Sequence, residues 1–279
     1  KWNEYFSHYK KIPQYELINQ EMTLNEFKII YYWEYIHRIL ARIIGVFFII
    51  PLFIFHLYYK LNNKHLTTCY VITFLILLQG LVGWYMVKSG LVNNVTVSHY
   101  RLSLHLSIAF IIISLVFWIL LNIRNNTYTK LLKKNSGSYI FYFLIILLLG
   151  QIILGAFVSG LDAGKIYQTW PLMDKTYFPS DTEINFFKDY LDFDNQGLVQ
   201  FYHRNAAYLI IAYIFFIGIY IYKKKKFFLI KPYSLLFFFL LIQIFLGVFT
   251  LTSGLNIYIA ISHQICSLIL ILCVFYKSF

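Results

Sequence analysis

Apolar residues in this chain gather in long stretches that short polar segments separate. Each stretch is about 20 residues or longer, the length of helix that crosses the hydrocarbon core of a bilayer. A segment in lipid must satisfy its backbone hydrogen bonds internally, so each stretch is predicted to be a helix. A capping-box pattern at Thr23 and Glu26 predicts that a long helix begins there and runs into the first span. The seven predicted spans are approximately residues 36–58, 68–88, 102–122, 139–159, 203–222, 233–253 and 257–276.

The composition supports an integral membrane protein. It is 59% hydrophobic and 13% charged, against about 45–50% and 25% for an average soluble domain. The net charge of +12 could indicate a nucleic-acid partner, but Lys and Arg occupy alternate connecting segments, as the positive-inside rule describes. We therefore expect membrane lipid around the chain and no nucleic acid. The basic residues of those inner segments are Lys60, Lys64, Arg124, Lys130, Lys133, Lys134, Lys223, Lys224, Lys225, Lys226, Lys231 and Lys277.

The other connecting segments are expected to face outward. They are residues 1–33, 89–101 and 160–202 and the short link near residue 255. The longest of them, 160–202, is acidic, with seven Asp and Glu residues against three lysines. This topology fits a bacterial inner membrane or a mitochondrial inner membrane, with the outer side in the periplasm or the intermembrane space.

Three of the spans share a polar signature. Each signature begins with Gln-x-x-x-Gly and ends with Ser-Gly-Leu, and the copies are Gln79–Leu91, Gln151–Leu161 and Gln243–Leu255. Spacing of this kind alone often only permits close helix contact. Three copies with the same ending, all on helices predicted to run outward, indicate an internal repeat.

The helices predicted to run inward each carry one histidine near the outer end: His37, His105, His203 and His263. One four-helix unit consists of an outward helix, an inward helix with histidine, a second outward helix and a second inward helix with histidine. Two such units form a parallel repeat. The predicted fold class is thus an all-α polytopic membrane protein of two pseudo-symmetric four-helix bundles, with seven spans present.

The predicted domains follow from this repeat. Residues 1–33 are an outward-facing polar segment, 34–138 a first half-bundle of three helices, and 139–279 a complete second bundle. The first bundle lacks its opening outward helix, and we expect this span to precede Lys1.

An ionisable side chain inside a bilayer is costly, so the four histidines carry a functional hypothesis. Two histidines on facing helices of a bundle can bind haem iron from opposite sides, and we predict the pairs His37 with His105 and His203 with His263. The alternative is that each histidine is a core side chain bonded to a neighbouring helix. Zinc or copper would require additional Cys, Asp or Glu ligands nearby.

The remaining histidines and the cysteines are assigned no chemistry. His8, His56, His65 and His99 lie in loops or at span ends and are expected to face solvent or the interface. Cys69, Cys266 and Cys273 fall within spans, and no disulfide is expected.

The two units differ beside their first histidine. Glu34 precedes His37 by three residues, on the same helix face, whereas Gln200 precedes His203. An acid in one unit and an amide in the other suggests a reactive first site and an electron-carrying second site, with Glu34 able to hold a water or accept a proton. The alternative is that Glu34 only pairs with Arg38 or Arg42. Arg38, Arg101 and Arg204 are candidate partners for haem propionates.

Long runs of sequence resemble haem A synthase, in the form found in alphaproteobacteria and mitochondria. In the first half they are MTLNEFKIIYYWEYIHRILAR (Met22–Arg42), LQGLVGWYMVKSGL (Leu78–Leu91) and VSHYRLSLH (Val97–His105). In the second half they are LGAFVSGLDAGKIYQTWPLM (Leu154–Met173), LVQFYHR (Leu198–Arg204) and AISHQ (Ala260–Gln264).

The resemblance implies an oxidoreductase that converts the C8 methyl group of haem O to the formyl group of haem A by successive hydroxylations, with oxygen from water. It implies that Glu34, His37 and His105 form the substrate site and that His203 and His263 are axial ligands of a haem b cofactor. Haem O synthase and cytochrome oxidase assembly factors are the partners it implies, and the oligomeric state is left open.

Two further functions are compatible with the four histidines. A dihaem b-type cytochrome would only relay electrons, and Glu34 beside one site but not the other argues against it. A haem or ion transporter would be expected to have helices broken near the midplane, whereas Gly and Pro are sparse in these spans.

Overall fold

The structure, a computed structural model, describes residues 1–58, 62–90, 96–127 and 139–276. Seven of its helices are long and apolar enough to cross a membrane, which confirms the seven predicted spans. The described residues form helices and no strand, so the all-α class is confirmed as well. The long helices are α3 (Leu24–Leu57), α4 (Asn63–Gly90), α5 (His99–Arg124), α6 (Tyr139–Gly160), α7 (Gln196–Lys223), α8 (Ile230–Thr252) and α9 (Ile257–Tyr276).

The chain forms two compact units, residues 1–112 and 113–279, and the division falls within α5. The predicted domain boundary at residues 138 and 139 borders a segment outside the described residues, and it stays a prediction. Each unit is described by itself below.

The first unit opens with two short helices, α1 (Trp2–Tyr9) and α2 (Pro13–Leu17). Aromatic rings join α1 to the first turns of α3, with the Phe6 and Tyr9 centroids 5.2 and 5.0 Å from that of the buried Phe27. Trp2 meets Tyr31 edge-on at 5.2 Å. Part of the segment expected to be polar and outward-facing is therefore folded onto the start of the first span.

Helix α3 begins where the capping box predicts. The Thr23 hydroxyl accepts a hydrogen bond from the Glu26 backbone nitrogen at 3.3 Å, and the Glu26 carboxylate accepts one from the Thr23 backbone nitrogen at 2.8 Å. These contacts satisfy N–H groups that the first turn of a helix leaves without an intrahelical partner. The helix then runs for 34 residues, through Pro51, and packs against α4.

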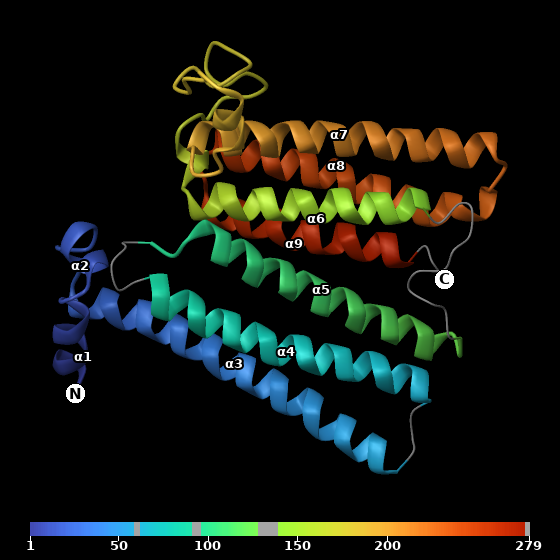
Figure 1. Cartoon of the computed structure of the whole chain (residues 1–279), viewed down its shortest axis with the longest axis horizontal. Coiled ribbons are helices and arrows are strands. Elements are labelled where there is room, and N and C mark those ends of the chain that lie inside the picture. The colour runs from blue at the N-terminus through green and yellow to red at the C-terminus, as the bar shows by residue number, and fades with distance from the viewer. Residues whose placement is uncertain (59–61, 91–95, 128–138, 277–279) are drawn as a thin grey trace. The chain divides into compact units, whose positions relative to one another are not determined.

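The second unit is a closed four-helix bundle of α6 to α9 (Figure 1). Helix α6 contacts α7 and α9, and α8 contacts the same two helices. Apolar side chains fill the space between them because every helix presents several to the interior. The most buried of these are Leu144, Ile214, Ile217 and Ile271.

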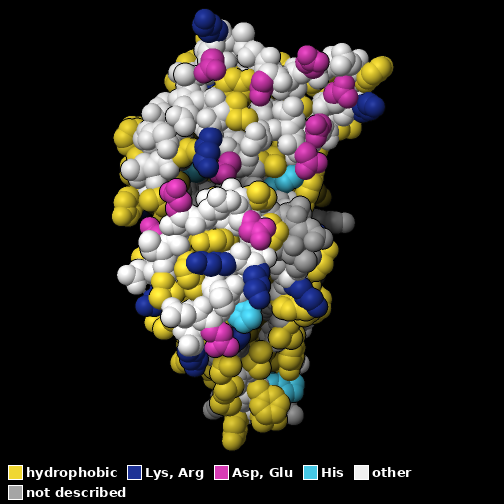
Figure 2. Space-filling view, turned by 90° about the vertical axis from the view of Figure 1, so that its left-hand side faces the viewer, with side chains coloured by type: hydrophobic (Ala, Val, Ile, Leu, Met, Phe, Trp, Pro, Cys, Tyr) yellow, Lys and Arg dark blue, Asp and Glu magenta, His cyan; other side chains and the backbone are white. Residues whose placement is uncertain are grey.

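Residues 161–195 join α6 to α7 and lie over the end of the bundle at which α6 ends and α7 begins (Figure 1). They include the short helices η1 (Ala163–Lys165) and η2 (Phe187–Leu191). Two side chains at the start of α7 hold this loop. The Gln196 amide donates a hydrogen bond to the Leu161 carbonyl. The Gln200 amide donates one to the Tyr167 carbonyl at 2.9 Å. Acidic side chains are scattered over the face that carries the loop (Figure 2).

The link between α8 and α9 is only four residues long, from Ser253 to Asn256. Gly254 and Leu255 both adopt left-handed backbone conformations there, with φ of 70° and 63°. A left-handed conformation causes little steric strain at glycine, which has no Cβ atom, so Gly254 allows the chain to turn here. The Ser-Gly-Leu ending of this signature thus marks the point where α8 stops and the chain reverses.

Candidate functional site

Each Gln-x-x-x-Gly signature places its glutamine and glycine against the histidine of the next long helix. We call the glutamine, the glycine four residues later and that histidine a histidine seat. The structure contains three seats: Gln79 and Gly83 with His105, Gln151 and Gly155 with His203, and Gln243 and Gly247 with His263.

The first seat joins α4 to α5 in the first unit. The Gln79 amide nitrogen lies 3.3 Å from Nε2 of the His105 ring and donates to the His105 backbone carbonyl at 3.0 Å. A Cβ atom at Gly83 would lie 3.0 Å from Cε1 of the same ring. The edge of the imidazole therefore rests closely on α4 at Gly83, where a larger residue would push the ring away.

The second seat repeats this arrangement between α6 and α7. The Gln151 amide nitrogen lies 3.2 Å from Nδ1 and 3.4 Å from Nε2 of His203, and it donates to the His203 backbone carbonyl at 3.0 Å. A Cβ atom at Gly155 would lie 3.1 Å from Cε1 of that ring.

The third seat joins α8 to α9. The Gln243 amide nitrogen lies 3.4 Å from Nε2 of His263, and a Cβ atom at Gly247 would lie 2.9 Å from Cε1. In all three seats the glutamine Oε1 is buried and makes no hydrogen bond to a described residue. The same is true of Nδ1 of His105 and of His263.

The predicted histidine pairs are brought together within each unit. The rings of His203 and His263 lie close enough for their charges to interact, and so do those of His37 and His105. His203, His263 and His105 are half-buried, whereas His37 is exposed.

Glu34 forms an ion pair with Arg38, one helical turn along α3. This is the contact that the alternative reading of Glu34 predicts. Both side chains are 50% exposed, so the carboxylate also remains accessible beside His37.

The other two candidate arginines make different contacts. The Arg101 guanidinium lies over the Tyr85 ring, 4.9 Å from its centroid. Arg204 donates to two carbonyls of the 161–195 loop, that of Tyr167 at 3.0 Å and that of Leu172 at 3.2 Å. Arg204 therefore holds the loop in this structure, and its role as a propionate partner stays a prediction.

The prediction for the remaining histidines is wrong at His99. This residue begins α5 as expected of a span end, but its side chain is only 5% exposed, and its ring lies tilted against that of Tyr100 with the centroids 4.0 Å apart. Nδ1 of His56 and the Tyr70 hydroxyl form a hydrogen bond of 3.0 Å. The three cysteines are buried thiols, as expected.

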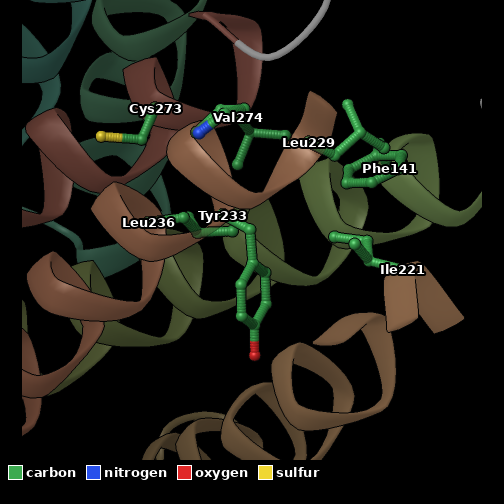
Figure 3. Close-up of a pocket in the computed structure, with 8 residues that line it drawn as sticks. Phe141, Ile221, Leu229, Tyr233, Leu236, Cys273 and Val274 are labelled. Carbon is green, nitrogen blue, oxygen red and sulfur yellow. The ribbon is translucent and has the colours of Figure 1, made fainter. Parts of the chain in front are cut away.

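A small apolar pocket lies at the end of the bundle opposite the 161–195 loop (Figure 3). It contains none of the four histidines, and its cavity volume is ≈ 10 Å³, about the room for one water. This pocket is therefore not part of the candidate site. Its lining residues are Phe141, Ile221, Leu229, Pro232, Tyr233, Leu236, Cys273 and Val274.

The histidine pairs fit a haem better than a bare metal ion. Among the described residues, no three His, Cys, Asp or Glu side chains gather as ligands for an ion. Two imidazoles are a sufficient protein contribution where a porphyrin supplies the other four ligands of the iron. The buried Nδ1 atoms of His105 and His263, which make no hydrogen bond to a described residue, also fit rings that are held in place for a further partner.

Seven span-length helices, four of which carry the candidate histidines, define a polytopic membrane protein. The model of the family described as cytochrome oxidase assembly protein matches residues 1–275 of this chain. The chain therefore belongs to this family, and within it to the haem A synthases.

Three similar proteins, each called heme A synthase, illustrate this membership. The protein from Pelagibacter ubique is 44% identical over 97% of this chain and 79% of its own length. That from Flavobacterium johnsoniae is 37% identical over 97% of this chain and 81% of its own length. The protein from Wolbachia pipientis is 39% identical over 94% of this chain and 73% of its own length.

Proposed function

We propose that this chain acts in haem A biosynthesis and oxidises the C8 methyl group of haem O to the formyl group of haem A. The observation that carries the proposal is the difference between the two histidine pairs. An accessible carboxylate, Glu34, stands one turn from His37, whereas the corresponding Gln200 is buried and bonded to the Tyr167 carbonyl. One pair thus has an acid–base group at hand, and the other has none at that position.

In this proposal His37 and His105 would hold the substrate haem, and His203 and His263 would hold the haem b cofactor. A bound haem b supplies a one-electron carrier. The closed bundle of α6 to α9 suits this task, since a carrier that is neither consumed nor released benefits from a rigid apolar surrounding.

The overall conversion adds one water to the methyl group and removes four protons and four electrons, which leaves a formyl group. Glu34 is placed to accept protons released at the first site, because its carboxylate is accessible and on the same helix face as His37. Arg38 holds that carboxylate in one position through the ion pair. A haem b held by His203 and His263 would supply the one-electron chemistry by which the four electrons pass to an external one-electron acceptor.

The chain is proposed to work in a bacterial inner membrane or a mitochondrial inner membrane, with its histidines toward the outer side. Haem O synthase and cytochrome oxidase assembly factors are its proposed partners. A homo-oligomer is compatible with this function.

A dihaem cytochrome that only relays electrons is the second candidate. The observation that favours it is the likeness of the His105 seat to those of His203 and His263, because like seats suit like cofactors. The two functions differ in whether the haem at His37 and His105 is changed chemically.

The test is expression of the complete gene in cells that make haem O but no haem A, followed by extraction and chromatography of the haems. Wild type is expected to yield haem A or its hydroxylated intermediate, and Glu34→Ala and His37→Ala are expected to yield neither. Glu21→Gln, at an exposed acid ahead of α3, is the matched control and should retain the product. Recovery of only haems b and O from folded wild type would favour the dihaem cytochrome.

A further inference from the structure

We propose that Gln79, Gln151 and Gln243 are positioning residues for the histidines that bind haem. In each seat the glutamine amide orients the imidazole of the next long helix, and the glycine one turn later lets the ring lie against the helix backbone. This inference rests on the proposed function, because it concerns the same histidines as haem ligands.

The recurrence of the contact is the first support. The glutamine and its histidine are 26, 52 and 20 residues apart in the three seats, so no local turn of the chain imposes the contact. The shortest distance between the amide nitrogen and a ring nitrogen nevertheless stays between 3.2 and 3.4 Å. Three different helix pairs therefore place a glutamine amide beside the histidine ring. The nearest ring nitrogen is Nε2 in the His105 and His263 seats, whereas in the His203 seat Nδ1 lies at 3.2 Å and Nε2 at 3.4 Å.

The chemistry of the amide is the second support. An amide nitrogen only donates, so the ring nitrogen that faces it must accept and carries no proton. At His105 and His263 the facing atom is Nε2, which places the proton of the neutral ring on Nδ1. This tautomer leaves the Nε2 lone pair for iron, and the partner of a ligand histidine commonly fixes its tautomer in this way.

The amide is itself fixed in two of the seats. Gln79 and Gln151 each donate to the backbone carbonyl of their histidine at 3.0 Å. A carbonyl accepts only from the nitrogen end of the amide, so this contact decides which way the side chain points. The ring is therefore oriented by a group that cannot turn over without losing a hydrogen bond.

Each seat also contains an unused acceptor, the buried Oε1 of the glutamine. In the His105 and His263 seats an unused donor is present as well, the Nδ1–H of the ring. A haem iron held at Nε2 would take the lone pair that accepts from the amide, and the buried Nδ1 and Oε1 atoms would still be available to other partners.

The glycine makes the close approach possible. A Cβ atom would stand 2.9 to 3.1 Å from Cε1 of the ring in the three seats, so an alanine there would require the imidazole to shift. The chain provides matched controls on the same helices, because a Cβ atom at Gly80 or Gly150 would meet nothing within 4 Å.

The test uses the complete protein with its haems, purified after expression. Its readouts are the electron paramagnetic resonance g values of the ferric haems, the midpoint potential of haem b and the haem b content per protein. The variants are Gly155→Ala with Gly150→Ala as its control, and Gln151→Met with Gln151→Glu, which keeps an acceptor of similar reach. Gln243→Met tests the other ligand of the same haem.

We expect Gly150→Ala to match wild type in all three readouts. Gly155→Ala and Gln151→Met should change the g values and the potential and weaken haem b binding by about 10- to 100-fold, as loss of a partner of a ligand histidine does elsewhere. Gln151→Glu should recover haem content but with a lower potential, because a carboxylate makes the imidazole a stronger donor.

Two failures are distinguishable. If wild type shows no low-spin haem with two histidine ligands, the proposed function fails. If wild type shows that signal and Gly155→Ala, Gln151→Met and Gln243→Met all match Gly150→Ala, the positioning role alone is overturned. Should Gly155→Ala fail to fold, the two glutamine variants, which keep nearly the same side-chain volume, still decide the question.

Discussion

The Glu34 carboxylate and the Arg38 guanidinium form an ion pair one helical turn apart on α3, immediately around His37 in the sequence. At half-exposed positions such a pair contributes little to stability, about 0–1 kcal/mol. Its value is therefore expected in the chemistry of the first site and not in the folding of the chain.

Replacing Glu34 by Gln should lower the yield of oxidised haem by about 10² to 10⁴-fold, the usual contribution of a positioned acid or base. The stability of the protein should hardly change, because the ion pair is exposed to this degree. The measurement is the rate of haem A formation per haem b, with the melting temperature in detergent beside it. Equal activity of Glu34→Gln and wild type would remove Glu34 from the mechanism.

Arg38 offers a graded test of the same pair. Arg38→Lys keeps a cation within reach of Glu34 and should retain most of the activity, whereas Arg38→Gln should lose more. If both variants lose haem from the first site while Glu34→Gln keeps it, Arg38 contacts the substrate directly, as the propionate prediction states.

Arg204 is expected to stabilise the 161–195 loop. Its two hydrogen bonds to loop carbonyls involve a charged donor, and bonds of this kind contribute about 1.5–3 kcal/mol each. Arg204→Ala should therefore raise the rate of proteolytic cleavage within the loop, with Arg124→Ala as the control on another helix. Loss of haem b without faster cleavage would instead support the propionate role.

Much of the fold follows from local sequence. The seven spans are visible because a bilayer requires about 20 apolar residues in a row, and the start of α3 is visible because a capping box involves only residues three apart, here Thr23 and Glu26. The Glu34–Arg38 pair was predictable as an alternative for the same reason, since residues four apart meet on a helix.

The parts that sequence reasoning missed are contacts between distant segments. The Gln-x-x-x-Gly signature was recognised as a repeat, but its contact with the histidine depends on which helix packs beside it. The anchoring of the loop by Gln200 and Arg204 was missed because the loop has no periodic pattern. Burial of His99 was missed because a position at a span end does not show what covers it.

Gly218 on α7 faces Tyr233 on α8, whose ring is directed away from the other labelled side chains of the pocket in Figure 3. A Cβ atom at Gly218 would overlap the tyrosine hydroxyl, which donates to the Ile214 carbonyl at 3.3 Å. Gly218→Ala should therefore destabilise the bundle by about 1–3 kcal/mol, as overpacking does.

A double-mutant cycle tests this contact. In a Tyr233→Leu background the hydroxyl and the ring are absent, so Gly218→Ala should cost much less there than in wild type. Thermal unfolding in detergent measures the difference, and Gly150→Ala serves as the control for placing alanine in an open helical position. Equal costs in the two backgrounds would show that Tyr233 is not what Gly218 accommodates.

The 161–195 loop should loosen at acidic pH through Asp189. The backbone N–H groups of Phe186 and Asn185 donate to its carboxylate at 2.8 and 2.9 Å, and these bonds hold the pKa of Asp189 below its usual value. For a carboxyl whose pKa is lowered by folding, the stabilisation is complete above the unfolded-state pKa, about 4, and is lost as pH falls through the lower folded-state value.

Cleavage by pepsin at Phe186 and Phe187 should thus accelerate in wild type as pH falls below about 4, after correction for the activity of the protease on an unfolded peptide. Asp189→Asn should be cleaved quickly throughout that range, and Glu183→Gln, at another acid of the same loop, should behave as wild type. An unchanged pH profile in Asp189→Asn would mean that a different group controls the loop.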